Sequence, residues 1–185
     1  MKLGVICDGI SRDLSHALKV MDEFGLDYAE LQFVWDKEVG DHDASEIAQI
    51  KELLDTHNKP VSCLSRHIFA GLTTASKAGD KDHTRHMDYL KCVIEMAHQL
   101  NCPLVRIMTS KKEQILWGTN GAEHWNVAKG AWDTLPPLIA PAVDLARTEG
   151  VTLVVETGNG TMVNSNYTAV KLIDCLLYTS PSPRD

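Results

Sequence analysis

The sequence predicts an α/β fold in which a parallel β-sheet is built from successive strand–helix units. Five short apolar segments alternate along the chain with segments whose apolar residues recur at helical spacing. Consecutive parallel strands need a crossover between them, so this alternation indicates a parallel sheet with right-handed connections. The 185 residues suffice for one domain with a sizeable core.

The predicted strands are short. They cover residues 3–7, 28–34, 61–67, 104–109 and 152–156. Helical spacing of apolar residues predicts helices over 14–24, 47–54 and 87–100. For the second helix, the stretch DASE predicts a capping box in which Asp43 is the cap and Glu46 lies three residues on.

Two further helices complete the pattern. The fourth is expected over about 128–149, where three prolines predict a late start or a kink: Pro136, Pro137 and Pro141. The fifth is expected over about 166–177. His83 and His86 lie three residues apart at the start of the third helix, where neighbouring charges predict a solvated face.

Five such units fit two architectures. One is an open, doubly wound five-stranded sheet, which is complete at this length. The other is a (β/α)8 barrel, of which this chain supplies only the first five units, since a whole barrel needs about 250 residues. Strand order distinguishes them, because a barrel fragment has its strands side by side in sequence order, whereas the doubly wound order is 2-1-3-4-5.

The ends of the predicted strands favour the partial barrel. Side chains alternate along a strand, so each of strands two to five has one apolar and one polar face. The polar residues lie late in these strands: Glu30 and Gln32, Ser65 and His67, Arg106, and Glu156. Both faces of a central doubly wound strand meet apolar helices, whereas barrel strands carry a polar site at their carboxyl ends. We therefore expect residues 1–174 to form a partial barrel.

Composition and charge narrow the classes of function. The net charge is −7 and no Lys/Arg cluster stands out, which weighs against nucleic acid or an anionic membrane as a partner. The five cysteines are scattered without a CxxC pair, as in reduced cytosolic proteins. The N-terminal stretch MKLGVICDG lacks the apolar core of a signal peptide, so a cytoplasmic location is expected.

The last residues differ in character from the rest. Residues 175–185 end in YTSPSPRD, where Pro181 and Pro183 oppose regular structure. This stretch resembles the translated adapter-derived tail of truncated reading frames. We expect a non-native disordered tail and a longer parent protein; a natural disordered C-terminus is the alternative.

Three motifs in order carry a family resemblance. They are AELQ on the second strand, VRIMTS on the fourth and LVVETGN on the fifth. With these motifs the chain resembles the xylose-isomerase-like TIM barrels, the superfamily of sugar phosphate isomerases and epimerases that also includes endonuclease IV. The second strand ends without a His, so the trinuclear zinc site of endonuclease IV is not expected, and DNA repair is a poor interpretation.

The resemblance implies a metal-dependent isomerase or epimerase of a sugar, sugar phosphate or related polyol, as the activity of the full-length parent. It implies that Glu156 binds a divalent metal (Mn, Mg, Co or Zn) and moves the substrate proton. A metal bridging carbonyl and hydroxyl oxygens acidifies the carbon-bound proton, and a carboxylate beside it can accept that proton. A structural ion pair between Glu156 and Arg106 is the alternative. The remaining ligands and the second carboxylate are expected beyond this sequence.

The other candidate residues are expected to bind substrate. The resemblance implies that Glu30 and His67 face the substrate at the rim. Arg106 offers a fork of donors to a hydroxyl or phosphate oxygen. Asn159 stands two residues beyond Thr157, which replaces the usual Asn of the family. Trp125, in a Gly-containing stretch after the fourth strand, is expected either to stack on a sugar ring from a lid or to be buried in an ordinary loop.

Two alternative functions stay open. A lyase or dehydratase on the same scaffold would act on a keto-sugar or inosose. A flavodoxin-like signalling or binding domain would need an acidic pocket or a phosphate-binding first loop, and DGISRD lacks both patterns. The expected partner is a small carbohydrate, and a homo-oligomer of the full-length protein is possible.

Overall fold

The computed structural model describes residues 2–112 and 121–179. The chain divides into two compact units. Unit 1 comprises Met1–Arg66, Tyr89–Arg106 and Glu149–Val154, and unit 2 comprises His67–Asp88, Ile107–Thr148 and Val155–Asp185. In the described residues, no helix combines the length and the apolar character that a membrane span requires.

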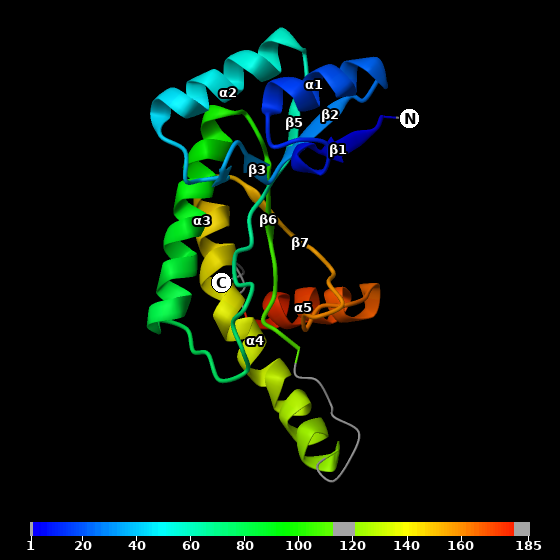
Figure 1. The fold of residues 1–185 in the computed structure, drawn as a ribbon. Coiled ribbons are helices and arrows are strands. Elements are labelled where there is room, and N and C mark those ends of the chain that lie inside the picture. The colour runs from blue at the N-terminus through cyan, green and yellow to red at the C-terminus, as the bar shows by residue number, and fades with distance from the viewer. Residues whose placement is uncertain (1, 113–120, 180–185) are drawn as a thin grey trace. The chain divides into compact units, whose positions relative to one another are not determined.

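A five-stranded sheet forms the centre of unit 1, and only the last residues of two strands belong to unit 2 (Figure 1). Its order is β1-β2-β5-β6-β7, which follows the sequence and confirms the predicted arrangement. The bounds are β1 Gly4–Ile6, β2 Tyr28–Leu31, β5 Val61–Ser65, β6 Leu104–Ile107 and β7 Thr152–Val155. The pairs β1·β2, β2·β5 and β5·β6 are parallel. A doubly wound sheet would place β1 inside, so this order rules that architecture out.

The second predicted strand is shorter than expected. After Leu31 the chain forms a two-stranded antiparallel hairpin of β3 (Phe33–Val34) and β4 (Lys37–Glu38). Trp35 turns the chain by taking a left-handed backbone conformation with φ 54°. The backbone N–H of Phe33 donates to Oδ1 of Asp8 (3.4 Å). The prediction of one strand over 28–34 is therefore wrong beyond Leu31.

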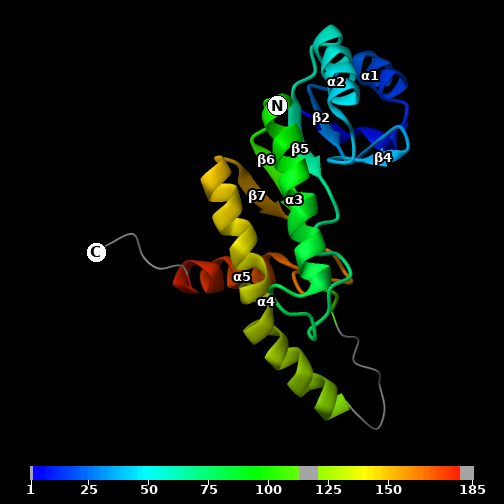
Figure 2. The same ribbon diagram turned by 90° about the vertical axis from the view of Figure 1, so that its left-hand side faces the viewer.

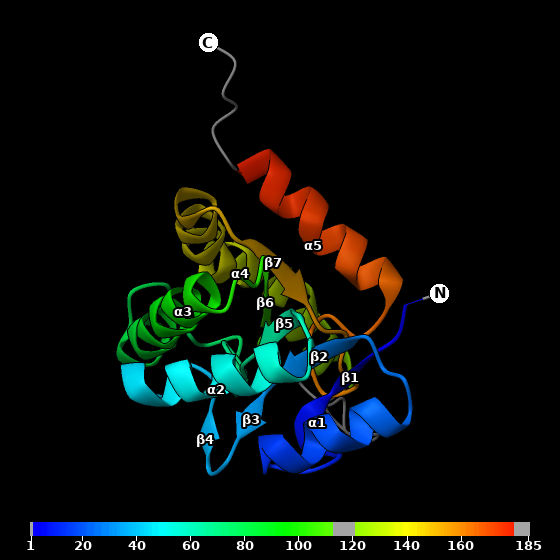
Figure 3. The ribbon, with the colours of Figure 1, turned by 90° about the horizontal axis from the view of Figure 1, so that it is seen from above.

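Helices α1 (Leu14–Glu23) and α2 (Ala44–Thr56) lie side by side in unit 1 (Figures 2 and 3). The predicted capping box is present: Oδ1 of Asp43 accepts from the backbone N–H of Glu46 (2.9 Å), and Glu46 Oε2 accepts from the backbone N–H of Asp43 (2.8 Å). The box satisfies backbone donors that a helix start leaves without partners.

The remaining helices are α3 (Lys81–Gln99), α4 (Gly121–Glu149) and α5 (Asn166–Thr179). Helix α4 starts earlier than predicted and continues through all three prolines, so the expected late start is wrong. The residues around the prolines are buried, among them Leu135, Leu138, Ile139 and Ala142. Burial of this apolar face offsets the backbone hydrogen bonds that the prolines remove. Residues 175–179 of the expected tail lie in α5, and the rest of that tail lies outside the described residues.

One buried arginine fixes the hairpin within unit 1. Arg66 follows β5, and its Nη1 donates to the carbonyl of Val39 (2.7 Å) and to Oδ1 of Asp41 (2.7 Å). Nη2 reaches Oδ2 of the same carboxylate (3.1 Å), and Nε lies 3.5 Å from Oε2 of Glu38. The guanidinium stacks over the ring of Tyr89, 4.2 Å from its centroid. This planar fork ties the end of the hairpin to the carboxyl end of β5.

Gly40 lies where the hairpin meets α3, and a side chain there does not fit. Its φ is 91°, and an added Cβ would lie 2.8 Å from Cγ2 and 3.1 Å from the backbone nitrogen of Val93. We expect Gly40→Ala to lower the free energy of unfolding by about 2 kcal/mol, from backbone strain and overpacking together. Gly9→Ala is the matched control because an added Cβ there meets nothing within 4 Å. Equal urea midpoints for the two variants would contradict the close approach.

Candidate functional site

Polar side chains line the carboxyl ends of three neighbouring strands in unit 1. Glu30 on β2 is paired in register with Cys63 on β5, and Ser65 on β5 is paired with Arg106 on β6. The register of β2 and β5 shifts between Ala29 and Glu30, a bulge-like irregularity. Bulges often re-aim a side chain next to a functional site. The structure thus brings Glu30 and Arg106 to the carboxyl ends of the strands, on either side of β5.

Ser65 holds the carboxylate of Glu30. Its Oγ donates to Oε1 of Glu30 at 2.5 Å, and Ser65 itself is fully buried (0% exposed). Glu30 is half-buried. We did not single out Ser65 as a site residue from the sequence. The signal was its place on the polar face of the strand, since a buried hydroxyl almost always has a hydrogen-bond partner.

Two buried thiols, those of Cys63 and Cys7, lie near these polar groups, and their pKa values are raised. The pKa of Cys63 is raised to about 11, chiefly by burial and also by the charge of Glu30. The hydrogen bond with Ser65 and the charge of Arg106 oppose this rise. Burial and the nearby carboxylates of Asp8 and Glu30 raise the pKa of Cys7 to about 12. Both thiols therefore stay protonated near neutral pH, and neither is a nucleophile.

In unit 2, Glu156 follows directly after β7. Its backbone N–H donates to the carbonyl of Ile107 (3.1 Å), so the parallel pairing continues to this residue. Its side chain is exposed. Asn159 is also exposed, in a turn closed by the bond from Gly158 N–H to the carbonyl of Val163 (3.0 Å). The side chain at the end of this apolar strand therefore lies at the surface rather than in the core.

The two other predicted site residues also belong to unit 2. His67 is exposed and comes directly after Arg66. Trp125 lies in the first turns of α4, a helix where a loop was expected, and its side chain lies outside the described residues.

His83 and His86 are buried, which corrects the expectation of a solvated face. Nδ1 of His83 accepts from the backbone N–H of Gly79 (3.1 Å), while its Nε2 lies 2.8 Å from the carbonyl of Leu138. Nδ1 of His86 accepts from the backbone N–H of Phe69 (3.0 Å). The segment between β5 and α3 covers these rings, which sequence spacing could not show. Their bonds to backbone groups make them structural residues.

The described residues do not form a metal centre by themselves. Among them, no group of three or more His, Cys, Asp or Glu side chains could hold a metal ion. Glu156 supplies a single exposed carboxylate of the kind that a divalent ion binds.

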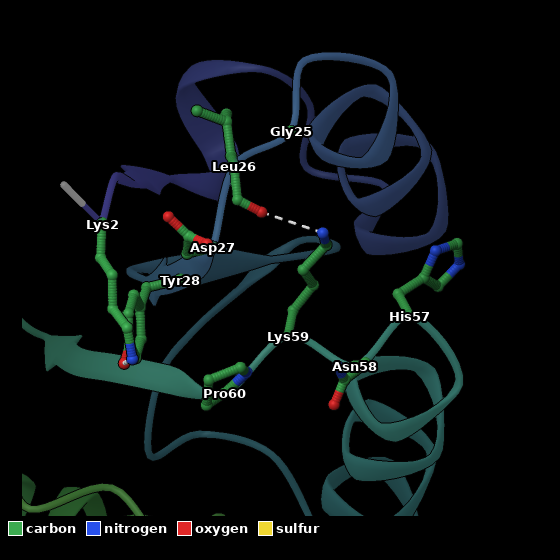
Figure 4. A pocket seen from close by; sticks show the side chains of 9 residues that line it. All are labelled: Lys2, Gly25, Leu26, Asp27, Tyr28, His57, Asn58, Lys59 and Pro60. Carbon is green, nitrogen blue, oxygen red and sulfur yellow. Dashed lines mark hydrogen bonds between the residues drawn. The ribbon is translucent and has the colours of Figure 1, made fainter.

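A cavity of about 410 Å³ lies in unit 1 at the amino ends of β1, β2 and β5, the opposite end of the strands from Glu30. Figure 4 shows Lys2 beside Tyr28, and Lys59 donating to the carbonyl of Leu26 (2.9 Å). Lys59 also pairs with Asp22 (2.9 Å). The charges of this cavity are thus largely engaged within the protein. The lining residues are Lys2, Gly25, Leu26, Asp27, Tyr28, His57, Asn58, Lys59 and Pro60.

Solved structures of similar fold share little sequence identity with this chain. The IOLI protein with a bound zinc atom has a TM-score of 0.68 and 17% identity, over 96% of this chain and 59% of that one. A D-allulose 3-epimerase from Methylomonas sp., in complex with D-allulose, has a TM-score of 0.63 and 13% identity, over 96% of this chain and 59% of that one. A protein from Mycobacterium smegmatis in complex with magnesium has a TM-score of 0.57 and 16% identity, over 88% of this chain and 52% of that one.

The chain therefore spans between half and three-fifths of the length of these three structures. Others of this fold are another epimerase, a probable dehydratase and an AP endonuclease of family 2. A comparison with curated proteins gives no match. The sequence model of one family matches residues 18–179, most of the chain. With the strand order and the polar carboxyl ends of its strands, this match shows that the chain belongs to the xylose isomerase-like TIM barrel family.

Proposed function

We propose that the full-length protein is an isomerase or epimerase that moves a proton next to the carbonyl of a sugar, sugar phosphate or related polyol. The observation that carries this proposal is the row of polar side chains at the carboxyl ends of parallel strands, where barrels of this kind place their sites. The structural likeness to an epimerase in complex with D-allulose supports the substrate class.

Glu156 is the proposed base. A carboxylate at a strand end accepts the proton from the carbon beside the carbonyl, and in an isomerisation it returns that proton to the neighbouring carbon. The exposed side chain of Glu156 is open to a substrate. Inversion at one carbon needs a second acid on the opposite face of the substrate, and we propose that this group lies outside the present 185 residues.

A divalent ion, when bound, would stabilise the negative charge that develops on the substrate oxygens. Glu156 would contribute one ligand to it, and the other ligands would come from residues that the structure does not describe. The zinc and magnesium of two similar structures support the choice of a divalent ion.

Incubating the full-length protein in D2O with a panel of keto-sugars, sugar phosphates and inososes tests this function. We expect deuterium at one carbon next to the carbonyl, with Mn, Mg, Co or Zn supplied in turn. Loss of water from the substrate would instead indicate the lyase alternative. No exchange and no product with any combination would contradict the proposal.

A further inference from the structure

We infer that Ser65 is a positioning residue, which holds Glu30 so that its second oxygen accepts a hydroxyl group of a polyol substrate. The inference rests on the proposed function for its substrate class, and it adds a polar half-site formed by Glu30, Ser65 and Arg106. All three residues lie in unit 1, on the neighbouring strands β2, β5 and β6.

In the hydrogen bond between Ser65 and Glu30, the serine hydroxyl group is the donor and the carboxylate is the acceptor. A serine hydroxyl has a single proton, and Oγ of Ser65 lies 2.5 Å from Oε1 of Glu30 but 3.6 Å from Sγ of Cys63, so Glu30 is its main acceptor. Ser65 is fully buried, and its Oγ also lies against Sγ of Cys63 (3.6 Å). A side chain packed this closely has little freedom to turn. It therefore fixes the plane and the direction of the carboxylate.

The other oxygen of Glu30 is left for a ligand. Among the residues that the structure describes, none donates a hydrogen bond to Oε2. Glu30 is half-buried, so this oxygen is partly shielded from water. An ionised carboxylate in such a place is stabilised by a further donor, and the hydroxyl group of a substrate is one.

Arg106 completes the half-site with the opposite chemistry. It is paired in register with Ser65 and is 7% exposed. Its guanidinium offers only donors, whereas the carboxylate of Glu30 offers only acceptors. Ser65 is thus bonded to Glu30 and paired in register with Arg106, which places both residues next to it. A ligand with several hydroxyl groups can donate to the carboxylate and accept from the guanidinium. This combination describes a polyol or a sugar better than an apolar molecule or a simple anion.

The test compares three variants of the full-length protein. In Ser65→Ala the carboxylate of Glu30 loses its fixed donor, and we expect KM to rise about tenfold while kcat changes less than about twofold. Ser65→Thr keeps a hydroxyl group and should restore most of the loss. Ser62→Ala is the matched control on the same strand, since Oγ of Ser62 bonds only to the backbone carbonyl of Ala29 (3.2 Å). Its KM should equal that of the wild type.

A merely structural role predicts another pattern. If Ser65→Ala lowers the melting temperature but leaves KM and kcat per folded molecule unchanged, the inference is overturned. It is also overturned if Ser65→Thr behaves like Ser65→Ala with an intact fold.

Equilibrium binding separates this inference from the proposed function. We would measure the affinity for D-allulose and for myo-inositol by saturation-transfer NMR on the full-length protein. If no substrate turns over but Ser65→Ala weakens binding and Ser65→Thr does not, the proposed reaction fails and the half-site stands. If neither probe binds, or if wild type and Ser65→Ala bind both equally, the half-site fails.

Discussion

Replacing Glu156 by Gln is expected to abolish turnover in the full-length protein and to leave its fold intact. Gln keeps the shape of the side chain but removes the negative charge and the proton acceptor. General-base catalysis is worth about 10²–10⁴ in rate, so kcat should fall at least that far. Glu156 is exposed, so the substitution removes no buried apolar surface. Turnover of a keto-sugar panel and the melting temperature, measured on the same samples, check both parts.

A control variant and the ion-pair alternative show whether the effect belongs to Glu156 as a base. Glu149→Gln is the same change at another exposed glutamate, at the end of α4, and should have no effect on turnover. If Glu156 has only a structural ion pair with Arg106, Glu156→Gln and Arg106→Met should both lower the melting temperature while bound metal stays constant. Near-normal turnover with full metal content in Glu156→Gln would refute the proposed mechanism.

Replacing Arg66 by Met is expected to cost about 2–3 kcal/mol of unfolding free energy. Breaking a buried charge pair costs more than this, but Asp41 is 46% exposed and water replaces part of the lost interaction. The variant also leaves the carbonyl of Val39 without its donor and removes the stacking on Tyr89. A decrease of about 5–10 °C in the melting temperature should follow for a chain of this size.

Arg147→Met provides the matched control for this change. Arg147 pairs with Asp144 on the surface of α4, where both side chains are about two-thirds exposed (65% and 66%). Such a pair contributes little, so its loss should move the melting temperature by no more than about 2 °C. Arg66→Lys keeps the charge but not the planar fork, and it should lie between wild type and Arg66→Met. Equal melting temperatures for Arg66→Met and Arg147→Met would contradict the proposed contribution of the Arg66 contacts to stability.

The features that could be predicted from sequence depend on local periodicity. The order of the strands follows from the alternation of strand and helix patterns, and the box at Asp43 and Glu46 follows from two residues three apart. Period-two alternation also placed Glu30 opposite the buried Ala29 and Leu31. These signals are contained in a few neighbouring residues, so no tertiary information was needed.

The features that were missed depend on contacts between distant residues. The hairpin of β3 and β4 is held by Arg66, which follows it in sequence by 25 residues or more. The burial of His83 depends on the backbone of Leu138 in another helix. The role of Ser65 depends on Glu30, 35 residues away, and on the register of β2 with β5. A pattern along one segment does not encode which distant group completes a hydrogen bond.

The order of the strands also bears on how the chain folds during synthesis. Each strand of β1-β2-β5-β6-β7 pairs with the sheet strand made just before it, so no later segment has to be inserted between two earlier ones. No two neighbouring strands of this sheet have another of its strands between them in the sequence, which keeps the contacts between strands comparatively local. A nascent chain leaving the ribosome can add one strand at a time to an existing edge. The growing edge is exposed until the next unit arrives, and an exposed strand edge is prone to pair with other chains.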